Sequence, residues 1–562
     1  MKSKAAEKTL APKEGSPQEA AGLLELADRI APVVEAGAAE SEARREMTGA
    51  VFKTLLDAGF YRLLLPRSVG GFEVPPSLFS RIIERIARAD GSAAWCLGQA
   101  GGCAMAAAHL EPEAAKEIFE PPRAVLAWGA GPRGQALSVE GGYEVTGTWL
   151  FASGGRQANW MGAHVPLCEA DGTPRQSEDG KPLVRTMLFP AEEAKLIDVW
   201  HVMGLRATGS DNYSVEGLFV PQARSFVLDG QPHPTQEGVA YRFPITLVYG
   251  ASFAGVALGL ARGLLEAFIE LAKAKVPQKQ SKTLRDSPVI QVQVAQAEAK
   301  LGSARMYLWG TLEEIEADLL ADGQRSLTAG QRMRIRLAAT HGIHQAKEAA
   351  DIAYRAAGST AIFENDAFER RFRDIHAVTQ QIQARHTQLE TVGQYLLGLT
   401  DDPGNYLAAQ PPHRARLLCP PSGKSLAERK TMELQFIDHF TISVRPHELE
   451  ALRAFYTGTF GLEEGRRPNF NFPGHWLYLD GRPVVHLAAN LPDDFEVPDG
   501  GMATGKFNHI SFRCKNLEAT RKRLTEKGVK FREAPVPEFP MHQVFVHDPA
   551  GLMIELTFMT EE

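Results

Sequence analysis

The stretch GGYEVTGTWLFASGGRQANW, residues 141–160, decides the fold of the first two thirds of this chain. Its alternating residues predict a strand that ends in a tight bend. Because side chains two residues apart lie on the same face of a strand, Trp149 and Phe151 are expected to form one wall of a flat apolar slot. Ser153 and Gly154 in the bend would offer a hydroxyl, a backbone N–H and close approach to a planar heterocycle. The alternative is an ordinary buried aromatic strand that ends in a glycine turn.

The composition is that of a soluble globular protein that acts on small molecules. With 562 residues the chain is too long for one core, and 44% of the residues are hydrophobic and 23% charged. A formal charge of −7 without a long basic run argues against nucleic acid as a partner. No window approaches the roughly 18 uninterrupted apolar residues of a membrane span, and the N-terminus lacks the apolar core of a signal peptide. The five cysteines are scattered, which fits a reducing cytoplasm and argues against a thiolate metal site.

The residue pattern changes along the chain and predicts an order of domains. A solvated tail over 1–16 precedes a helical domain over 17–123, an antiparallel barrel or sandwich over 124–235 and a helical bundle over 236–400. Within the bundle we expect helices over 251–273, 289–321, 331–357 and 374–397. Ser287 and Pro288 predict a helix start, with a capping hydroxyl followed by proline in the first turn. Several of these helices are too apolar to expose one face to solvent, which predicts a subunit contact between helices.

Two further segments of this region supply candidate site residues. Trp95 is the only bulky side chain in GSAAWCLGQAGGCAMAAAHL, so it is either a core residue or the wall of a pocket. The loop GLRATGS, residues 204–210, can present Thr208 and Ser210 as hydrogen-bond donors, although a plain hairpin loop has the same composition.

Helices, a small β domain and a four-helix bundle, with GGYEVTGTWLFASG and GLRATGSDNYSVEGLFVP at this separation, resemble the acyl-CoA dehydrogenase fold. More narrowly, residues 20–398 resemble its flavin-dependent monooxygenase branch, the oxygenase components of two-component aromatic hydroxylases and the dibenzothiophene monooxygenases. The resemblance implies reduced FMN or FAD supplied by a separate flavin reductase, and a homotetramer. It also implies Ser153 near the ring nitrogen N5, Trp149 and Phe151 along the ring, Gly154 in close approach, and Thr208 and Ser210 beside it.

Two departures bear on the reaction. The dehydrogenases of this fold use a glutamate to abstract a proton, and no carboxylate stands at the corresponding positions here, which favours the oxygenase branch. In the hydroxylases a segment like RDIHAxTQH ends in a histidine, and this chain has Gln381 at that position. Either His376 or His386 takes the proton instead, or the substrate needs no base; a lone histidine on a helix is more often structural.

After a linker over 401–431, rich in proline, glycine and charge, residues 432–562 form an internally duplicated domain. Each half reads as a β-α-β-β-β unit. His439 and His509 occupy matching strand positions, as do His486 and Glu555, all between apolar neighbours. Three imidazoles and a carboxylate related in this way predict an inward-facing divalent metal site; the alternative, four unrelated polar residues facing solvent, is disfavoured by the apolar flanks.

This segment resembles the vicinal oxygen chelate superfamily, which includes glyoxalase I and the extradiol dioxygenases, through FYTGTFGL and HDPAGLMIEL. Family ligands map onto His439, His509 and Glu555, and His486 would be a fourth ligand or a base. We therefore expect a multidomain α+β, cytoplasmic, bifunctional enzyme: hydroxylation of an aromatic or heteroaromatic substrate with O2, followed by extradiol-type ring cleavage, with Fe(II) favoured and Mn(II), Zn(II) or Ni(II) open. Three alternatives remain: a metal-dependent isomerase, lyase or epimerase; a ligand-binding C-terminal domain; or an acyl-CoA dehydrogenase-type first region.

Overall fold

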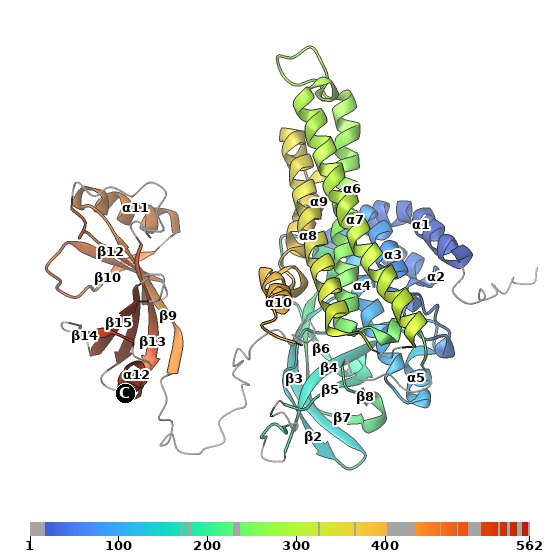
Figure 1. The fold of residues 1–562 in the computed structure, drawn as a ribbon, viewed down its shortest axis with the longest axis horizontal. Helices are drawn as coiled ribbons and strands as arrows, with labels where there is room; N and C mark the ends of the chain where they lie inside the picture. Colours follow the sequence, from blue (N-terminus) through green and yellow to red (C-terminus); the bar gives the residue numbers. More distant parts are fainter. Residues whose placement is uncertain are drawn as a thin grey trace, which may run out of the picture. The chain divides into compact units, whose positions relative to one another are not determined.

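A computed structural model describes residues 17–169, 172–176, 180, 182–228, 236–323, 326–364, 367–401, 433–460, 462–479, 481–492, 507–526, 529–536, 540–547 and 553–559. The expected tail over 1–16 and nearly all of the expected linker, 402–431, lie outside these residues. The chain divides into two compact units, Met1–Pro420 and Pro421–Glu562. Figure 1 shows both as ribbons.

The first unit begins with a helical layer built around a nearly wholly buried helix. Its helices are α1 (Pro17–Arg44), α2 (Gly49–Asp57), α3 (Pro76–Ala89), α4 (Gly91–Ala104) and α5 (Pro112–Phe119). The small residues of α4 permit close packing: a Cβ on Gly102 would lie 2.3 Å from the ring of Tyr249. This contact brings α4 against the bundle helix that carries Tyr249.

The next layer is a mixed sheet with the order β6-β7-β3-β2-β4-β5-β8, in which β1 pairs with β4. Its strands are β1 (Leu126–Trp128), β2 (Gln135–Val139), β3 (Gly142–Ala152), β4 (Trp160–Cys168), β5 (Val184–Pro190), β6 (Lys195–Ile197), β7 (Asp211–Pro221) and β8 (Ser225–Phe226). The expectation of a wholly antiparallel sheet is wrong, because β4 runs parallel to both β1 and β2. The hairpin from β2 to β3 and the bend after β3 each reverse the chain, so β4 returns in the direction of β2.

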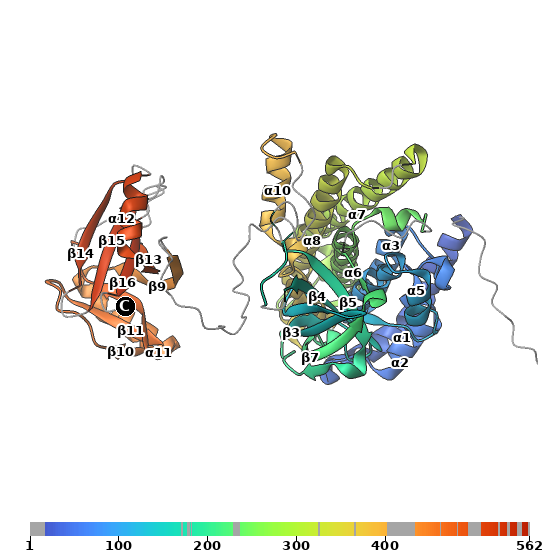
Figure 2. The same ribbon diagram turned by 90° about the horizontal axis from the view of Figure 1, so that it is seen from below.

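The bundle contains α6 (Ile245–Ala274), α7 (Pro288–Asp322), α8 (Ala329–Ala357), α9 (Ala367–Val378) and α10 (His386–Leu396). Figure 2 shows α6, α7, α8 and α10 of this bundle above the strands of the sheet. The expected single helix over 374–397 is wrong. The chain leaves the helix after Val378, because α8 satisfies the intervening backbone: the Thr340 hydroxyl donates to the Gln383 carbonyl at 2.7 Å, and His344 lies 2.8 Å from the Ala384 carbonyl. Helix α7 does begin at Pro288, but the Ser287 hydroxyl makes no capping bond.

By its length and composition, helix α6 could cross a membrane. This corrects the expectation that no segment of the chain comes near the apolar length of a membrane span. In this fold 78% of its most apolar window is buried within the protein. It packs against both α3 and α8, so its apolar composition is accounted for by its place at the centre of the first unit.

The second unit confirms the duplicated β-α-β-β-β organisation. Its elements are β9 (Glu433–Ser443), α11 (Leu449–Phe460), β10 (Glu463–Gly465), β11 (Gly474–Leu479), β12 (Arg482–Ala488), β13 (Phe507–Lys515), α12 (Leu517–Glu526), β14 (Phe531–Pro535), β15 (Met541–His547) and β16 (Met553–Met559). They form one sheet in the order β10-β11-β12-β9-β13-β16-β15-β14. The two repeats meet where β9 pairs antiparallel with β13. The four predicted metal residues therefore lie on four neighbouring strands, β12, β9, β13 and β16.

Candidate functional sites

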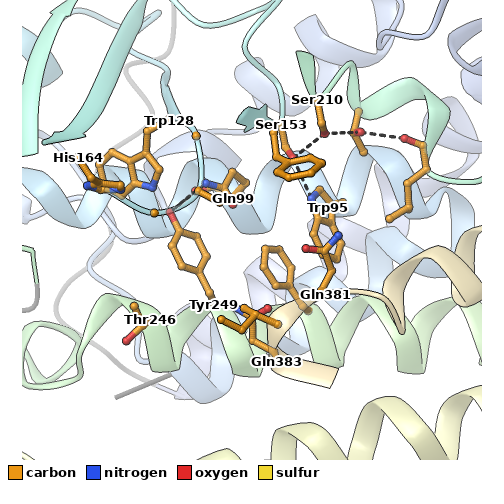
Figure 3. A pocket seen from close by; sticks show the side chains of 18 of the residues that line it. Trp95, Gln99, Trp128, Ser153, His164, Ser210, Thr246, Tyr249, Gln381 and Gln383 are labelled. Atoms are coloured by element: carbon orange, nitrogen blue, oxygen red, sulfur yellow. Dashed lines mark hydrogen bonds between the residues drawn. The ribbon is translucent and has the colours of Figure 1, made fainter. Parts of the chain in front are cut away.

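A cavity in the first unit lies between one face of the sheet, α4 and the start of α6. The space free of atoms in this cavity, which includes the part open to solvent, is about 860 Å³. Its walls are mostly aromatic and amide side chains (Figure 3), and the lining residues are Trp95, Gln99, Trp128, Gly129, Ala130, Gly131, Phe151, Ser153, His164, Trp200, Leu205, Thr208, Ser210, Leu228, Thr246, Tyr249, Phe253, Gln381, Ile382 and Gln383. None of these described lining residues carries a carboxylate.

Three hydroxyls form a relay along one wall of this cavity. The Trp95 indole N–H donates to the Ser153 hydroxyl at 3.1 Å, Ser153 lies 2.7 Å from the Ser210 hydroxyl, and Ser210 lies 2.7 Å from that of Thr208. Thr208 in turn donates to the Leu205 carbonyl at 2.8 Å. An indole N–H only donates and a carbonyl only accepts, so every hydroxyl of the relay donates in the same direction. Ser153 consequently gives its proton to Ser210 and keeps a lone pair for the cavity.

Trp149 and Phe151 do not form one wall, so that expectation is wrong. The Trp149 indole is fully buried in the core of the β domain, stacked on Tyr213 with ring centroids 5.4 Å apart. Phe151 is 54% exposed and lines the cavity. The ladder between β3 and β7 shifts register between Trp149 and Ala152, and Phe151 has φ of 65°. This bulge breaks the two-residue alternation and turns Phe151 to the other side.

The bend after β3 and the loop over 204–210 are joined by a backbone contact. The Gly154 N–H donates to the Thr208 carbonyl at 2.9 Å, so this N–H is not free to face a ligand as expected. Gly154 has φ of 74°, a conformation that favours glycine. Gly154 therefore holds together the two segments that carry the relay hydroxyls.

Gln381, at the position of the family histidine, lines the cavity, whereas neither histidine considered for proton transfer does. His376 lies on α9 with Nε2 3.1 Å from the Asp351 carboxylate, outside the cavity. His386 is an exposed residue at the start of α10, stacked on His344. Neither histidine reaches the space that Gln381 faces.

A different histidine, His164 on β4, lines the cavity and was not predicted. Its Nδ1 lies 2.8 Å from the buried Thr186 hydroxyl, and Trp128 packs against the ring. Burial lowers the pKa of His164 to about 4, so the ring is neutral near pH 7. A sequence signal existed: His164 interrupts the apolar strand WMGAHVPLC, as the predicted metal residues interrupt theirs.

In the second unit, the structure brings His439, His509 and Glu555 together. The two Nε2 atoms of the histidines are 3.3 Å apart, and the Glu555 carboxylate lies 3.1 Å from His509 and 3.9 Å from His439. All three side chains are buried, and one ligand atom from each lies within 4.8 Å of the others. Two imidazoles and a carboxylate that converge in this way form a common donor set for a divalent transition metal.

Glu555 is held in its charged form by the groups around it. Burial raises the pKa of this carboxyl, but hydrogen bonding to His509, the charges of both histidines and the Thr557 hydroxyl outweigh burial and hold the pKa at about 2. Ser511, Gln543 and Thr557 all donate to the same carboxylate oxygen, at 3.0, 2.8 and 2.6 Å. These donors fix the orientation of Glu555, as the partners of a ligating carboxylate commonly do.

His486 is the fourth predicted residue, and it lies between two rings instead of within the triad. It stacks on Trp476 with ring centroids 3.9 Å apart and on His439 at 3.7 Å. Its Nε2 is buried without a hydrogen-bond partner among the described residues. Burial, followed by the nearby His439 and His509, lowers the pKa of His486 well below its usual value, so the ring is neutral. An orphaned neutral imidazole next to a histidine and carboxylate set fits a metal centre better than a purely structural cluster.

The two units match two different family models. Residues 251–386 match the model described as acyl-CoA dehydrogenase, C-terminal domain. Residues 436–556 match the glyoxalase, bleomycin resistance protein and dioxygenase superfamily.

The first unit is also similar to characterised oxygenases. The chain is 30% identical over 366 residues to the indole-3-acetate monooxygenase of Pseudomonas putida, covering 65% of this chain and 91% of that protein. It is 28% identical over 359 residues to the oxygenase subunit HsaA of a flavin-dependent monooxygenase from Rhodococcus jostii (strain RHA1), covering 62% and 91%. The crystal structure of 3-HSA hydroxylase from Rhodococcus sp. RHA1 superposes with a TM-score of 0.62 at 27% identity, covering 67% of this chain and 97% of that chain.

Proposed function

Because this chain belongs to the flavin-dependent monooxygenases of acyl-CoA dehydrogenase-like fold, with a glyoxalase-superfamily domain at its C-terminal end, we propose that its first unit hydroxylates an aromatic substrate with O2. The reduced flavin, FMN or FAD, comes from a separate reductase. The observation that carries this proposal is the aromatic cavity whose wall holds the Ser153 relay and, among the described lining residues, no carboxylate.

The residues of the cavity suit a reduced flavin and a flat substrate. A bound reduced flavin supplies the electrons that activate O2. Ser153 would accept a hydrogen bond from the flavin, and Phe151 and Trp200 would contact a flat ring. The rings of Trp95 and Phe253 are stacked with their centroids 3.8 Å apart and would exclude water. None of the described lining residues carries a carboxylate, the group that removes the proton next to the thioester in the dehydrogenases, and this disfavours dehydrogenase chemistry.

Oxygen uptake tests this proposal. The purified full chain, given chemically reduced FMN and a panel of phenols and indoles, is expected to consume O2 and to form a product heavier by one oxygen atom, detected by mass spectrometry. Ser303→Ala, on the surface of α7, serves as a control that should behave as wild type. Oxidation of an acyl thioester without O2 uptake would instead establish a dehydrogenase.

For the second unit we propose a divalent metal held by His439, His509 and Glu555, with extradiol-type ring cleavage of the hydroxylated product as its reaction. The orphaned Nε2 of His486 and the charged, oriented Glu555 support metal binding. The metal would supply Lewis acidity and a site for O2. Ring cleavage of a catechol panel should require added Fe(II) and O2; turnover without O2 but with Mn(II) or Ni(II) would favour an isomerase or lyase.

A further inference from the structure

The imidazole of His164 is one of the polar groups of the cavity lining that the proposed chemistry does not use. It reaches the cavity from β4, on the face of the sheet opposite the core residues Ala163 and Val165. Trp128 packs edge-on against it, with ring centroids 5.1 Å apart at 64°, and fixes its orientation. In Figure 3, His164 and Trp128 lie on one side of the cavity and Ser153 and Ser210 on the other.

The partner of Nδ1 decides which ring nitrogen carries the proton. The Thr186 hydroxyl is 0% exposed, and among the described residues its only hydrogen-bond partner is Nδ1 of His164, at 2.8 Å. If Nδ1 were the donor, the Thr186 proton would be buried without an acceptor, which is costly. Thr186 therefore donates to Nδ1, and the single proton of the neutral ring sits on Nε2.

The remaining nitrogen then presents an N–H to the cavity. No other described residue hydrogen-bonds the ring, and Nε2 is not among the buried polar atoms that lack a partner, which is consistent with its facing open space. Of the described lining residues, His164 is the one with an imidazole. Its surroundings are aromatic, so a hydrogen bond made here is shielded from water and stronger than one at the surface.

We propose that His164 is a substrate-binding residue whose Nε2–H donates to an oxygen of the aromatic substrate, and that the site therefore prefers phenolate-, carboxylate- or carbonyl-bearing aromatics over unsubstituted ones. This rests on the proposed function for the identity of the cavity as the substrate site. It places the substrate oxygen on the side of the cavity away from the Ser153 relay.

Binding without turnover tests the proposal. Equilibrium dialysis of the full chain, without flavin, against naphthalene, 2-naphthol and 2-naphthoate separates the aromatic contribution from that of the oxygen. Wild type is expected to bind 2-naphthoate about tenfold more tightly than naphthalene, the change in affinity expected from one hydrogen bond to a charged acceptor. It is expected to bind 2-naphthol, a neutral phenol near pH 7, more tightly than naphthalene by a smaller factor. The two oxygen-bearing probes distinguish a phenolic oxygen from a carboxylate.

Variants identify the donor. His164→Leu should abolish the preference, measured as the ratio of the affinities for the oxygen-bearing probes to that for naphthalene in the same variant. His164→Gln, whose amide can donate, should retain part of it. Thr186→Val removes the donor to Nδ1 and should also reduce the preference. His386→Gln, outside the cavity, is the matched control and should bind all three probes as wild type does.

The outcomes separate this inference from the proposed function. Equal binding of the three probes by wild type, or an unchanged preference in His164→Leu and Thr186→Val, would overturn the role of His164 even if the enzyme hydroxylates aromatics. A preference that disappears in His164→Leu supports the role even if no hydroxylation is found. Should His164→Leu fail to fold, His164→Gln and Thr186→Val decide the same question.

Discussion

At the scale of single residues, the relay through Ser153, Ser210 and Thr208 is the best-defined polar feature of the cavity. Its direction is set at its ends by Trp95 and the Leu205 carbonyl. The relay joins α4, the bend after β3 and the loop over 204–210, three segments far apart in sequence. Removing one hydroxyl therefore affects both the cavity and the contacts between these segments.

Ser153→Ala is expected to reduce the amount of hydroxylated product formed per O2 consumed by roughly tenfold, because the cavity loses its one hydroxyl bonded to both Trp95 and Ser210. Oxygen electrode traces combined with product quantification measure this ratio. Product formation per O2 equal to that of the Ser303→Ala control would contradict a role for the hydroxyl.

At the scale of secondary-structure elements, two carboxyl groups hold segments of the first unit in place: Glu316 at the start of α3, and Asp374 at the loop over 204–210. Helix α3 has Pro75 at its N-cap and no capping side chain of its own. Glu316 on α7 takes that role, accepting from the Ser77 N–H at 2.7 Å and the Ser77 hydroxyl at 2.6 Å. Burial, opposed by the two bonds from Ser77, raises the pKa of Glu316 to about 7.

Glu316→Gln is expected to make the first unit more stable than wild type at about pH 8 and similar to it at about pH 5. Folding raises the pKa of this carboxyl from 4.5 to about 7, so the protonated form favours the folded state. Stability is therefore lost as the pH rises from about 4.5 to about 7. At about pH 8 the free energy of unfolding of Glu316→Gln should exceed that of wild type by about 3 kcal/mol.

Urea titrations followed by tryptophan fluorescence measure this change, since only Trp476 lies outside the first unit. Glu313→Gln, one turn away on α7 and paired with Arg81, is the matched control. If the two variants have the same pH dependence, Glu316 does not titrate as described.

The loop over 204–210 is anchored by α9. The Leu205 N–H donates to the Asp374 carboxylate at 2.6 Å, and Leu205 has φ of 54°, an uncommon conformation for a residue with a side chain. The Leu205 carbonyl in turn accepts the last bond of the relay. Burial, followed by the charge of Asp90, raises the pKa of Asp374 to about 7.

Asp374→Ala is expected to weaken binding of reduced FMN about tenfold, because the loop loses the acceptor that holds its strained residue. Asp374→Asn keeps an acceptor oxygen and should bind almost as wild type does. Anaerobic titration monitored by flavin fluorescence gives the affinities. Equal affinity in all three proteins would show that the loop keeps its conformation without this bond.

Sequence reasoning predicted elements better than the directions of side chains. The order of domains in the fold and the duplicated C-terminal unit follow from periodicity and repetition, which survive local irregularity. Trp149 and Phe151 were misplaced because a bulge is a tertiary adjustment that two-residue alternation does not reveal. The break between α9 and α10 depends on bonds from Thr340 and His344, far away in sequence, so the local pattern over 374–397 remained helical.

At the scale of the whole molecule, the chain combines two units, each with its own hydrophobic core and its own candidate site. The flavin proposal concerns only the first and the metal proposal only the second. Ligand binding to one unit should therefore stabilise that unit by mass action without requiring a change in the other.

Differential scanning calorimetry of the full chain is expected to show two unfolding transitions. Mn(II) should raise the midpoint temperature of only one of them. At a free metal concentration about 100 times the Kd, the stabilisation is about 2.7 kcal/mol. His439→Ala should abolish the shift. His475→Ala, which removes a histidine bonded to Glu450 and Glu464 elsewhere in the unit, should leave it intact. A shift that persists in His439→Ala would contradict the assigned ligands.

The one-way order of the hydroxyl relay has a consequence for redox selectivity. With its proton committed to Ser210, Ser153 can only accept from a ligand in the cavity, unless a bond at one end of the relay is given up. A reduced flavin ring carries nitrogen-bound hydrogens that the oxidised ring lacks. On the proposed function, the relay thus discriminates between oxidation states: it favours the arriving, electron-rich cofactor over the spent one, which would help the oxidised flavin to leave for the next cycle.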